Sequence, residues 1–387
     1  MKPATVIKRL YWYAFTGDLV LIYPLYVVLF SDSGIGPASI SLLLISWSVT
    51  SIIAEVPSGA LADKYPRKYL LIASSLMSAI AFTVWLASPT LAGFAIGFMI
   101  WGIGGALDSG TYDALVYDEL KVAKQEKKYV QVIGRAESIA LVAVLVATVL
   151  AGAVIEFGFT FVLVLSVVSQ LVTALIAASL PRVDPQKSTG EKKYFEVLRS
   201  GIREAVSIPT VAKLLLMTGF AGAIFGVVEE YIPLYFESDG TSLNLIPLSV
   251  AAASLTAAAA SFVAHRFEKL STAKLIAMLG ISGLLLALSG SATGVVAVVM
   301  IAGYSYVITA IAVIYDGKLQ HEIKGGERAT ITSVAAFLGE LMAIAMFLAF
   351  GWIAETQGVF EAFQWFGLAV IITATMLSLA RLKRASA

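Results

Sequence analysis

The positive charges of this chain are confined to alternate gaps between its apolar segments. All 27 Lys and Arg residues lie at a terminus, or in or beside every second gap between about a dozen such segments. They fall in seven groups: 2–9, 64–68, 121–135, 182–213, 266–274, 318–328 and 381–384. The intervening gaps, near 31–38, 88–90, 156–158, 237–241, 289–294 and 355–358, contain no basic residue. Because cytoplasmic loops of membrane proteins retain Lys and Arg, the pattern predicts a multi-pass membrane protein with both termini in the cytoplasm.

The composition supports a lipid environment. Hydrophobic residues make up 59% of the chain and charged residues 14%, whereas about a quarter of the residues in a soluble domain are charged. A helix needs roughly 20 apolar residues to cross the hydrocarbon. We therefore predict an all-α integral membrane protein with twelve transmembrane helices, near 8–29, 39–62, 69–87, 91–117, 132–155, 159–180, 210–235, 244–264, 273–289, 294–318, 329–353 and 359–380.

The two halves of the chain repeat each other. Short sequences at the ends of segments 4 and 10, at the starts of segments 5 and 11, and after segments 2 and 8 match at offsets between 193 and 202 residues. Segments 1 and 7 start on the same side, so the repeats are parallel. The sequence predicts an N-terminal six-helix bundle (1–180), a cytoplasmic linker (181–209) and a C-terminal six-helix bundle (210–387). Apolar residues at helical spacing among lysines and arginines favour an amphipathic helix in the linker, although a solvated tether is the alternative.

A short motif follows segment 2. The stretch Gly59-Ala60-Leu61-Ala62-Asp63-Lys64-Tyr65-Pro66-Arg67-Lys68 resembles the signature loop between helices 2 and 3 of the major facilitator superfamily of secondary transporters. The resemblance implies that family's fold, and a cytoplasmic gate formed by Gly59, Asp63, Arg67 and Lys68 with an acid at the end of segment 4, here Asp118. An acid at a helix C-terminus is unfavourable unless a cation lies nearby, so Arg67 or Lys68 is its expected partner.

The charges within the segments are all acidic. A charged side chain at the bilayer centre costs about 2.5 to 3.5 kcal/mol on insertion scales, so such groups usually face a cavity or a partner. The candidates for proton coupling or substrate binding are Asp18, Glu55, Asp108, Asp113, Glu229, Glu230 and Glu340. On a continuous helix Asp113 would lie about 140° around from Asp108, so we expect only one of the two to be functional. Glu137, near Arg135, is expected at the membrane surface.

Aromatic residues within the segments are candidates to bind a lipophilic cation through their ring faces. They are Tyr23, Tyr26, Trp101, Tyr231 and Tyr304. Each of them could also serve packing or anchoring at the interface, which is the commoner use of aromatic residues in membranes.

The absence of deeply placed cations disfavours anionic substrates, which need positive groups to replace their hydration. Desolvation favours the neutral form of a carboxyl group, so buried acids can exchange a proton for a cation. The sequence therefore predicts proton-coupled export, by antiport and alternating access, of lipophilic or cationic small molecules, including drugs. The alternatives are uptake or facilitated transport of a neutral metabolite such as a sugar or nucleoside, transport of a hard metal cation, and a sensor or scaffold that transports nothing.

No motif indicates an enzyme. The chain has no phosphate-binding Gly-Lys-Ser/Thr loop, no zinc-ligand spacing and no cysteine. We expect no cofactor and no bound metal, the proton gradient being the energy source. The expected partners are a small-molecule substrate, protons and the lipid bilayer, without nucleic acid, and the expected state is a monomer in the inner or plasma membrane of a prokaryote.

Overall fold

The computed structural model describes residues 3–182, 208–322 and 328–385, apart from a few side chains within the helices. These residues form helices, short 3-10 turns and connecting loops, without a β-strand among them. Because lipid offers no partner for backbone N–H and C=O groups, a helix, which bonds them internally, is the form in which such apolar segments cross a membrane. The predicted all-α class is confirmed.

The helices divide between two compact units. The helices of the first half are α1 (Pro3–Asp18), α2 (Tyr26–Asp32), α3 (Pro37–Lys64), α4 (Arg67–Ala87), α5 (Leu91–Asp108), α6 (Thr111–Val122), α7 (Tyr129–Val154) and α8 (Phe159–Ser179). Those of the second half are α10 (Pro209–Ser238), α11 (Ile246–Val263), α12 (Thr272–Ser289), α13 (Gly294–Glu322), α14 (Arg328–Thr356) and α15 (Val359–Ala385). Among the described residues, the first unit comprises 3–35, 42–182 and 243–248, and the second comprises the remainder. The predicted helix of the linker falls outside the described residues.

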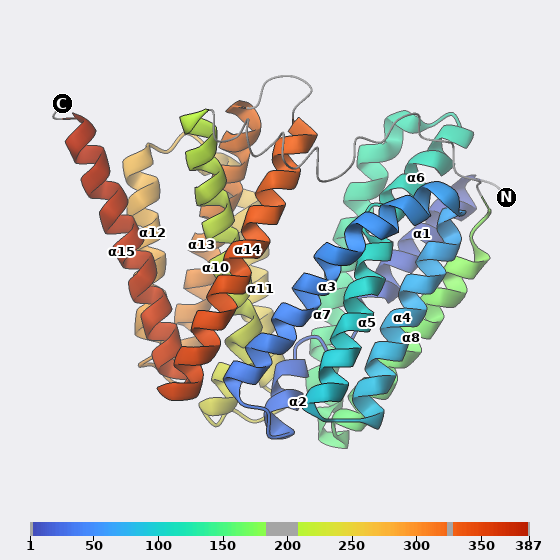
Figure 1. Ribbon diagram of the computed structural model, residues 1–387, viewed down its shortest axis with the longest axis horizontal. Coiled ribbons are helices and arrows are strands. Elements are labelled where there is room, and N and C mark those ends of the chain that lie inside the picture. The colour runs from blue at the N-terminus through green and yellow to red at the C-terminus, as the bar shows by residue number, and fades with distance from the viewer. Residues whose placement is uncertain (1–2, 183–207, 323–327, 386–387) are drawn as a thin grey trace. The chain divides into compact units, whose positions relative to one another are not determined.

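Eleven stretches of the described chain are long and apolar enough to cross a membrane. They correspond to predicted segments 2 to 12. The prediction of one continuous helix over 8–29 is wrong, because this segment is divided into α1 and α2 with non-helical backbone between them. The predicted segment 4 is also interrupted, between α5 and α6. Both interruptions lie in the first unit (Figure 1).

An aromatic cluster fills one end of the first unit. Phe30, Phe82, Trp85, Phe94 and Phe98 are all almost completely buried. Their rings pack mostly edge to face, and the Trp85 indole N–H donates a hydrogen bond to the carbonyl oxygen of Phe94 at 3.1 Å. The cluster ties α2 to α4 and α5, and so fixes the second half of the divided first segment.

In the second unit, α12 and α15 approach closely through glycines. A Cβ atom built on Gly367 would lie 2.2 Å from the backbone nitrogen of Ala287, and one built on Gly283 would lie 2.8 Å from the carbonyl oxygen of Gly367. Small residues at such positions let transmembrane helices pack backbone against backbone.

We predict that Gly367→Ala destabilises the protein by about 1 to 3 kcal/mol, because the added methyl group must push the two backbones apart. The matched control is Gly222→Ala on α10, where an added Cβ meets nothing within 4 Å. Thermal unfolding of the purified protein in detergent measures both. Equal unfolding temperatures for the two variants would contradict this account of the α12–α15 contact.

Candidate functional site

The first transmembrane segment is broken beside Asp18. The helix α1 ends at Asp18, and residues 19–25 run as loop and turns before α2 begins at Tyr26. A break within the membrane leaves backbone N–H and C=O groups that need other partners, and it is tolerated where protein groups provide them.

Three polar side chains of α8 provide those partners, and a fourth bonds a side-chain hydroxyl of the same segment. Gln170 donates from Nε2 to the carbonyl oxygen of Gly17 at 2.9 Å, and Ser169 donates from Oγ to that of Thr16 at 2.8 Å. Ser166 Oγ accepts the backbone N–H of Ile22 at 3.1 Å. Thr173 adds a hydroxyl–hydroxyl bond to Thr16 at 2.9 Å. Because these α8 residues follow helical spacing they share one face, and that face holds the broken segment in place.

A second break lies at the end of α5. This helix ends at Asp108, Ser109 is extended, and Gly110 adopts a left-handed conformation with φ of 67° before α6 starts at Thr111. Glycine tolerates this conformation without steric cost. After the break, Tyr112 near the start of α6 donates a hydrogen bond to the carbonyl oxygen of Leu10 on α1 at 3.0 Å.

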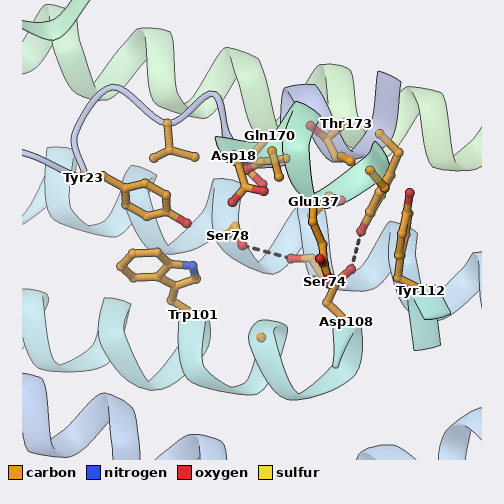
Figure 2. A pocket seen from close by; sticks show the side chains of 18 of the residues that line it. Asp18, Tyr23, Ser74, Ser78, Trp101, Asp108, Tyr112, Glu137, Gln170 and Thr173 are labelled. Carbon is orange, nitrogen blue, oxygen red and sulfur yellow. Dashed lines mark hydrogen bonds between the residues drawn. The ribbon is translucent and has the colours of Figure 1, made fainter. Parts of the chain in front are cut away.

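The two breaks border a cavity of about 280 Å³ within the first unit. Four acidic residues line it: Asp18, Asp108, Asp113 and Glu137. Figure 2 shows Asp18, Glu137 and Asp108 around the same space. Lys, Arg and His are absent from the described residues that form this wall. The cavity is therefore a site of concentrated negative charge.

Asp108 lies beside two tyrosines of the cavity wall, Tyr13 and Tyr112. The hydroxyl of Tyr13 donates to Asp108 Oδ1 at 2.5 Å, and the Tyr13 ring stacks on that of Tyr112 with centroids 5.6 Å apart. The Tyr13 hydroxyl carries no charge, so this hydrogen bond stabilises the Asp108 carboxylate without neutralising it. Asp108 also ends α5, where the helix dipole is negative, which adds to the attraction for a positive group.

Aromatic and hydroxyl groups complete the wall. Tyr23 and Trp101 stack with centroids 5.3 Å apart and lie beside the acids (Figure 2). Ser74, Ser75 and Ser78 of α4 line the cavity as well. The hydroxyls of Ser75 and Ser78 donate along their own helix, to the carbonyl oxygens of Leu71 at 3.0 Å and Ser74 at 3.3 Å. A hydroxyl oxygen that donates one bond still has acceptor capacity for a ligand.

The structure thus brings together five of the sequence candidates: Asp18, Asp108, Asp113, Tyr23 and Trp101. The prediction that Asp113 lies on a different helix face from Asp108 is wrong. It assumed one continuous helix, whereas the break at Ser109 and Gly110 resets the rotation and both carboxylates line the same cavity. Glu137 also lines the cavity, from α7, and its side chain is exposed; its placement at the membrane surface stays a prediction.

Three of the aromatic candidates belong to the packed interior instead. Tyr26 is 7% exposed and packs against Phe98. Tyr231 is fully buried, stacks on Phe350 at 4.0 Å, and shares a hydrogen bond with Ser41. Tyr304 is fully buried and donates to a backbone carbonyl at 3.1 Å. Their structural contacts account for these rings without a ligand.

The remaining acidic candidates do not join the cavity. Glu55 is exposed on α3, while Glu229, Glu230 and Glu340 lie on helices of the second unit. Glu229 accepts a long hydrogen bond of 3.4 Å from Ser254. Their proposed roles in proton coupling stay predictions.

The signature loop contains an ion pair. Arg67 Nη1 bonds to the Asp118 carboxylate and also donates to the carbonyl oxygen of Ala114 at 2.7 Å. Lys68 instead donates to the carbonyl oxygens of Ala178 and Leu180, at 3.2 and 3.0 Å, where it caps α8. Of the two expected partners of Asp118, Arg67 is therefore the one that pairs with it. Gly59 is exposed on α3, the side chain of Asp63 lies outside the described residues, and a gating role for this loop stays a prediction.

Besides Glu137, sequence reasoning missed seven polar residues of the cavity: Tyr13, Ser74, Ser75, Ser78, Tyr112, Gln170 and Thr173. Gln170 left a readable signal, since with Ser166, Ser169 and Thr173 it gives segment 6 a polar face at helical spacing. The two tyrosines left none, because their role depends on where the helices break. Among the described residues, no group of three or more His, Asp or Glu side chains is arranged to hold a metal ion.

The apolar helices, the paired breaks and the acid-lined cavity define a multi-pass membrane protein of the transporter class. The chain belongs to the Major Facilitator Superfamily, whose family model matches residues 11–347. The family confirms the resemblance carried by the signature loop, together with the twelve-helix architecture, and it indicates secondary transport of a small molecule rather than enzymatic catalysis.

Solved structures share this fold at low sequence identity. A point mutant of the nucleoside transporter NupG is 14% identical over 98% of this chain and 99% of its own, with a TM-score of 0.79. A bacterial homologue of the human lysosomal transporter Spinster is 14% identical over 98% of this chain and 97% of its own, with a TM-score of 0.76. A D-xylose-proton symporter is 16% identical over 96% of both chains, with a TM-score of 0.66. No curated protein matches the sequence.

We predict that Gln170→Leu destabilises the protein by about 1 to 3 kcal/mol, because the carbonyl group of Gly17 loses its partner in a buried place. Gln131→Leu is the matched control, since Gln131 is exposed on α7. Thermal unfolding in detergent measures the difference. A loss no greater than that of the control would show that α8 does not hold the broken segment.

Proposed function

We propose that this protein exports lipophilic or cationic small molecules across the membrane in exchange for protons. The observation that carries the proposal is a cavity with four carboxylates, no cationic side chain in its described wall, and a stacked aromatic pair. Carboxylates attract a positive group by charge, and an open aromatic ring face beside them adds about 0.5 to 2 kcal/mol. An anion in this cavity would meet repulsion and no compensating positive group.

Exchange follows from the fact that a proton and a cation compete for the same carboxylates. A protonated Asp18 or Asp108 offers no charge to a cationic substrate, and a bound substrate opposes protonation. If a movement of the two units opens this cavity first to one side of the membrane and then to the other, the cavity can bind one ligand on one side and release it on the other. The expected partners are then the substrate, the protons and the bilayer, with the proton gradient as the source of energy in a prokaryotic plasma membrane.

The second candidate is uptake of a neutral metabolite such as a sugar or a nucleoside. The hydroxyls of Ser74, Ser75 and Ser78, together with the amide of Gln170, could bond a polyhydroxylated ligand, and Tyr23 and Trp101 could stack on a ring. A nucleoside transporter and a D-xylose-proton symporter are among the structures with the same fold. In that case the carboxylates would accept hydrogen bonds from hydroxyl groups, and substrate would move with protons.

We predict that Asp18→Asn and Asp108→Asn each slow the exchange of tetraphenylphosphonium for protons by about tenfold or more, which corresponds to about 1.4 kcal/mol or more of lost stabilisation. The rate is measured in proteoliposomes under an imposed pH gradient. The control is Asp32→Asn, which removes the same charge from an exposed position on α2 outside the cavity. Movement of a nucleoside or D-xylose together with protons, with no movement of tetraphenylphosphonium, would reject export and favour the second candidate.

A further inference from the structure

Asp113 lies between the acidic cavity and the cytoplasmic ion pair. It lines the cavity with Asp18 and Asp108, and it also lines a neighbouring hollow of about 430 Å³ with Arg67 and Asp118. Both spaces belong to the first unit. Of the residues that form them, Asp113 is common to the two. A change in its charge therefore alters the electrostatic potential in the cavity and in the hollow.

The guanidinium of Arg67 has one unsatisfied hydrogen-bond donor in this hollow. Its Nη1 serves both Asp118 and the carbonyl oxygen of Ala114, while its buried Nε has no hydrogen-bond partner. A buried donor without a partner costs about 1 to 3 kcal/mol, so a rearrangement that satisfies it is favourable. Asp113 is the other acid that lines the hollow, and its carboxylate could accept a bond from this group.

Both acids are carried by one short helix behind a glycine. Asp113 lies in the first turn of α6 and Asp118 lies further along the same helix. The helix starts directly after Gly110, whose φ of 67° is open to glycine and unfavourable for most other residues. Both carboxylates line the hollow that contains Arg67, so the arginine side chain can turn from one acid to the other without a movement of α5.

We propose that Asp113 couples the cavity to the ion pair, because Arg67 and a cation in the cavity compete for its carboxylate. When the cation holds Asp113, Arg67 pairs with Asp118 alone. When the cation leaves, Arg67 forms ion pairs with both Asp113 and Asp118. Asp113 thus binds the cation and also transmits the occupancy of the cavity to the signature loop. The choice of a cation as the competing ligand rests on the proposed function.

Competition makes the two events energetically linked, and the linkage is reciprocal. If Arg67 weakens the binding of a cation by drawing on Asp113, then removal of Arg67 strengthens that binding. We expect Arg67→Gln to tighten the binding of tetraphenylphosphonium by about fivefold or more, the lower end of typical coupling between sites. In a protein that already carries Asp113→Asn, the same Arg67→Gln change should alter the affinity less than twofold.

The matched control is Lys68→Gln, which removes an equal charge from the next residue. Lys68 bonds to the carbonyl oxygens at the end of α8, so its loss should change the affinity less than twofold. Binding of tetraphenylphosphonium to the purified full chain in nanodiscs measures all the variants. An equal gain from Arg67→Gln with and without Asp113 would overturn the proposal, since it would reflect only the general field of the arginine.

A second measurement needs no ligand and separates this proposal from the proposed function. In an Asp118→Asn protein Arg67 should turn to Asp113, so a further Arg67→Gln change should still lower the unfolding temperature. In the Asp113→Asn, Asp118→Asn double variant the same Arg67→Gln change should lower it clearly less. If the two decreases are equal, Arg67 does not use Asp113 and the coupling is rejected. If tetraphenylphosphonium does not bind the wild-type protein but the decreases differ, the exporter hypothesis fails and the pairing stands.

Discussion

The hydrogen bonds from α8 to the broken first segment are the interaction on which the site depends. An interrupted helix in lipid leaves polar backbone groups whose cost must be met by protein groups. Here Ser166, Ser169 and Gln170 meet it by bonding to Ile22, Thr16 and Gly17. Without these bonds a continuous helix would have the lower free energy. Asp18 would then lie within that helix and not at a helix end beside the cavity.

The breaks also determine the electrostatics. Asp18 and Asp108 are the last residues of α1 and α5, and the C-terminal end of a helix carries a partial negative charge. Two negative helix ends and their carboxylates therefore face one space, where the described wall holds no basic side chain. The concentrated negative charge favours the binding of protons or other positive groups. The surrounding hydrogen bonds offset part of the cost of holding these charges together.

The sequence predicted most of the fold and about half of the site. The alternation of Lys and Arg with apolar segments depends only on topology, so it indicated the helices and their order. Asp18, Asp108, Tyr23 and Trp101 were found because charged residues and large rings within a segment are conspicuous. The relation between Asp108 and Asp113 was misjudged, because helical periodicity holds only while the helix is continuous and Gly110 interrupts it. Residues that act through the break, such as Tyr13 and Gln170, become visible only in three dimensions.

The position of a bound cation tests the central claim most directly. Tetraphenylarsonium has the shape and charge of tetraphenylphosphonium, and its arsenic atom can be located by anomalous diffraction from crystals of the complex. The account predicts one arsenic peak in the cavity of the first unit, near Asp18 and Asp108 and beside the Tyr23–Trp101 pair. Saturated crystals in which the arsenic lies elsewhere, with this cavity unchanged, would contradict it.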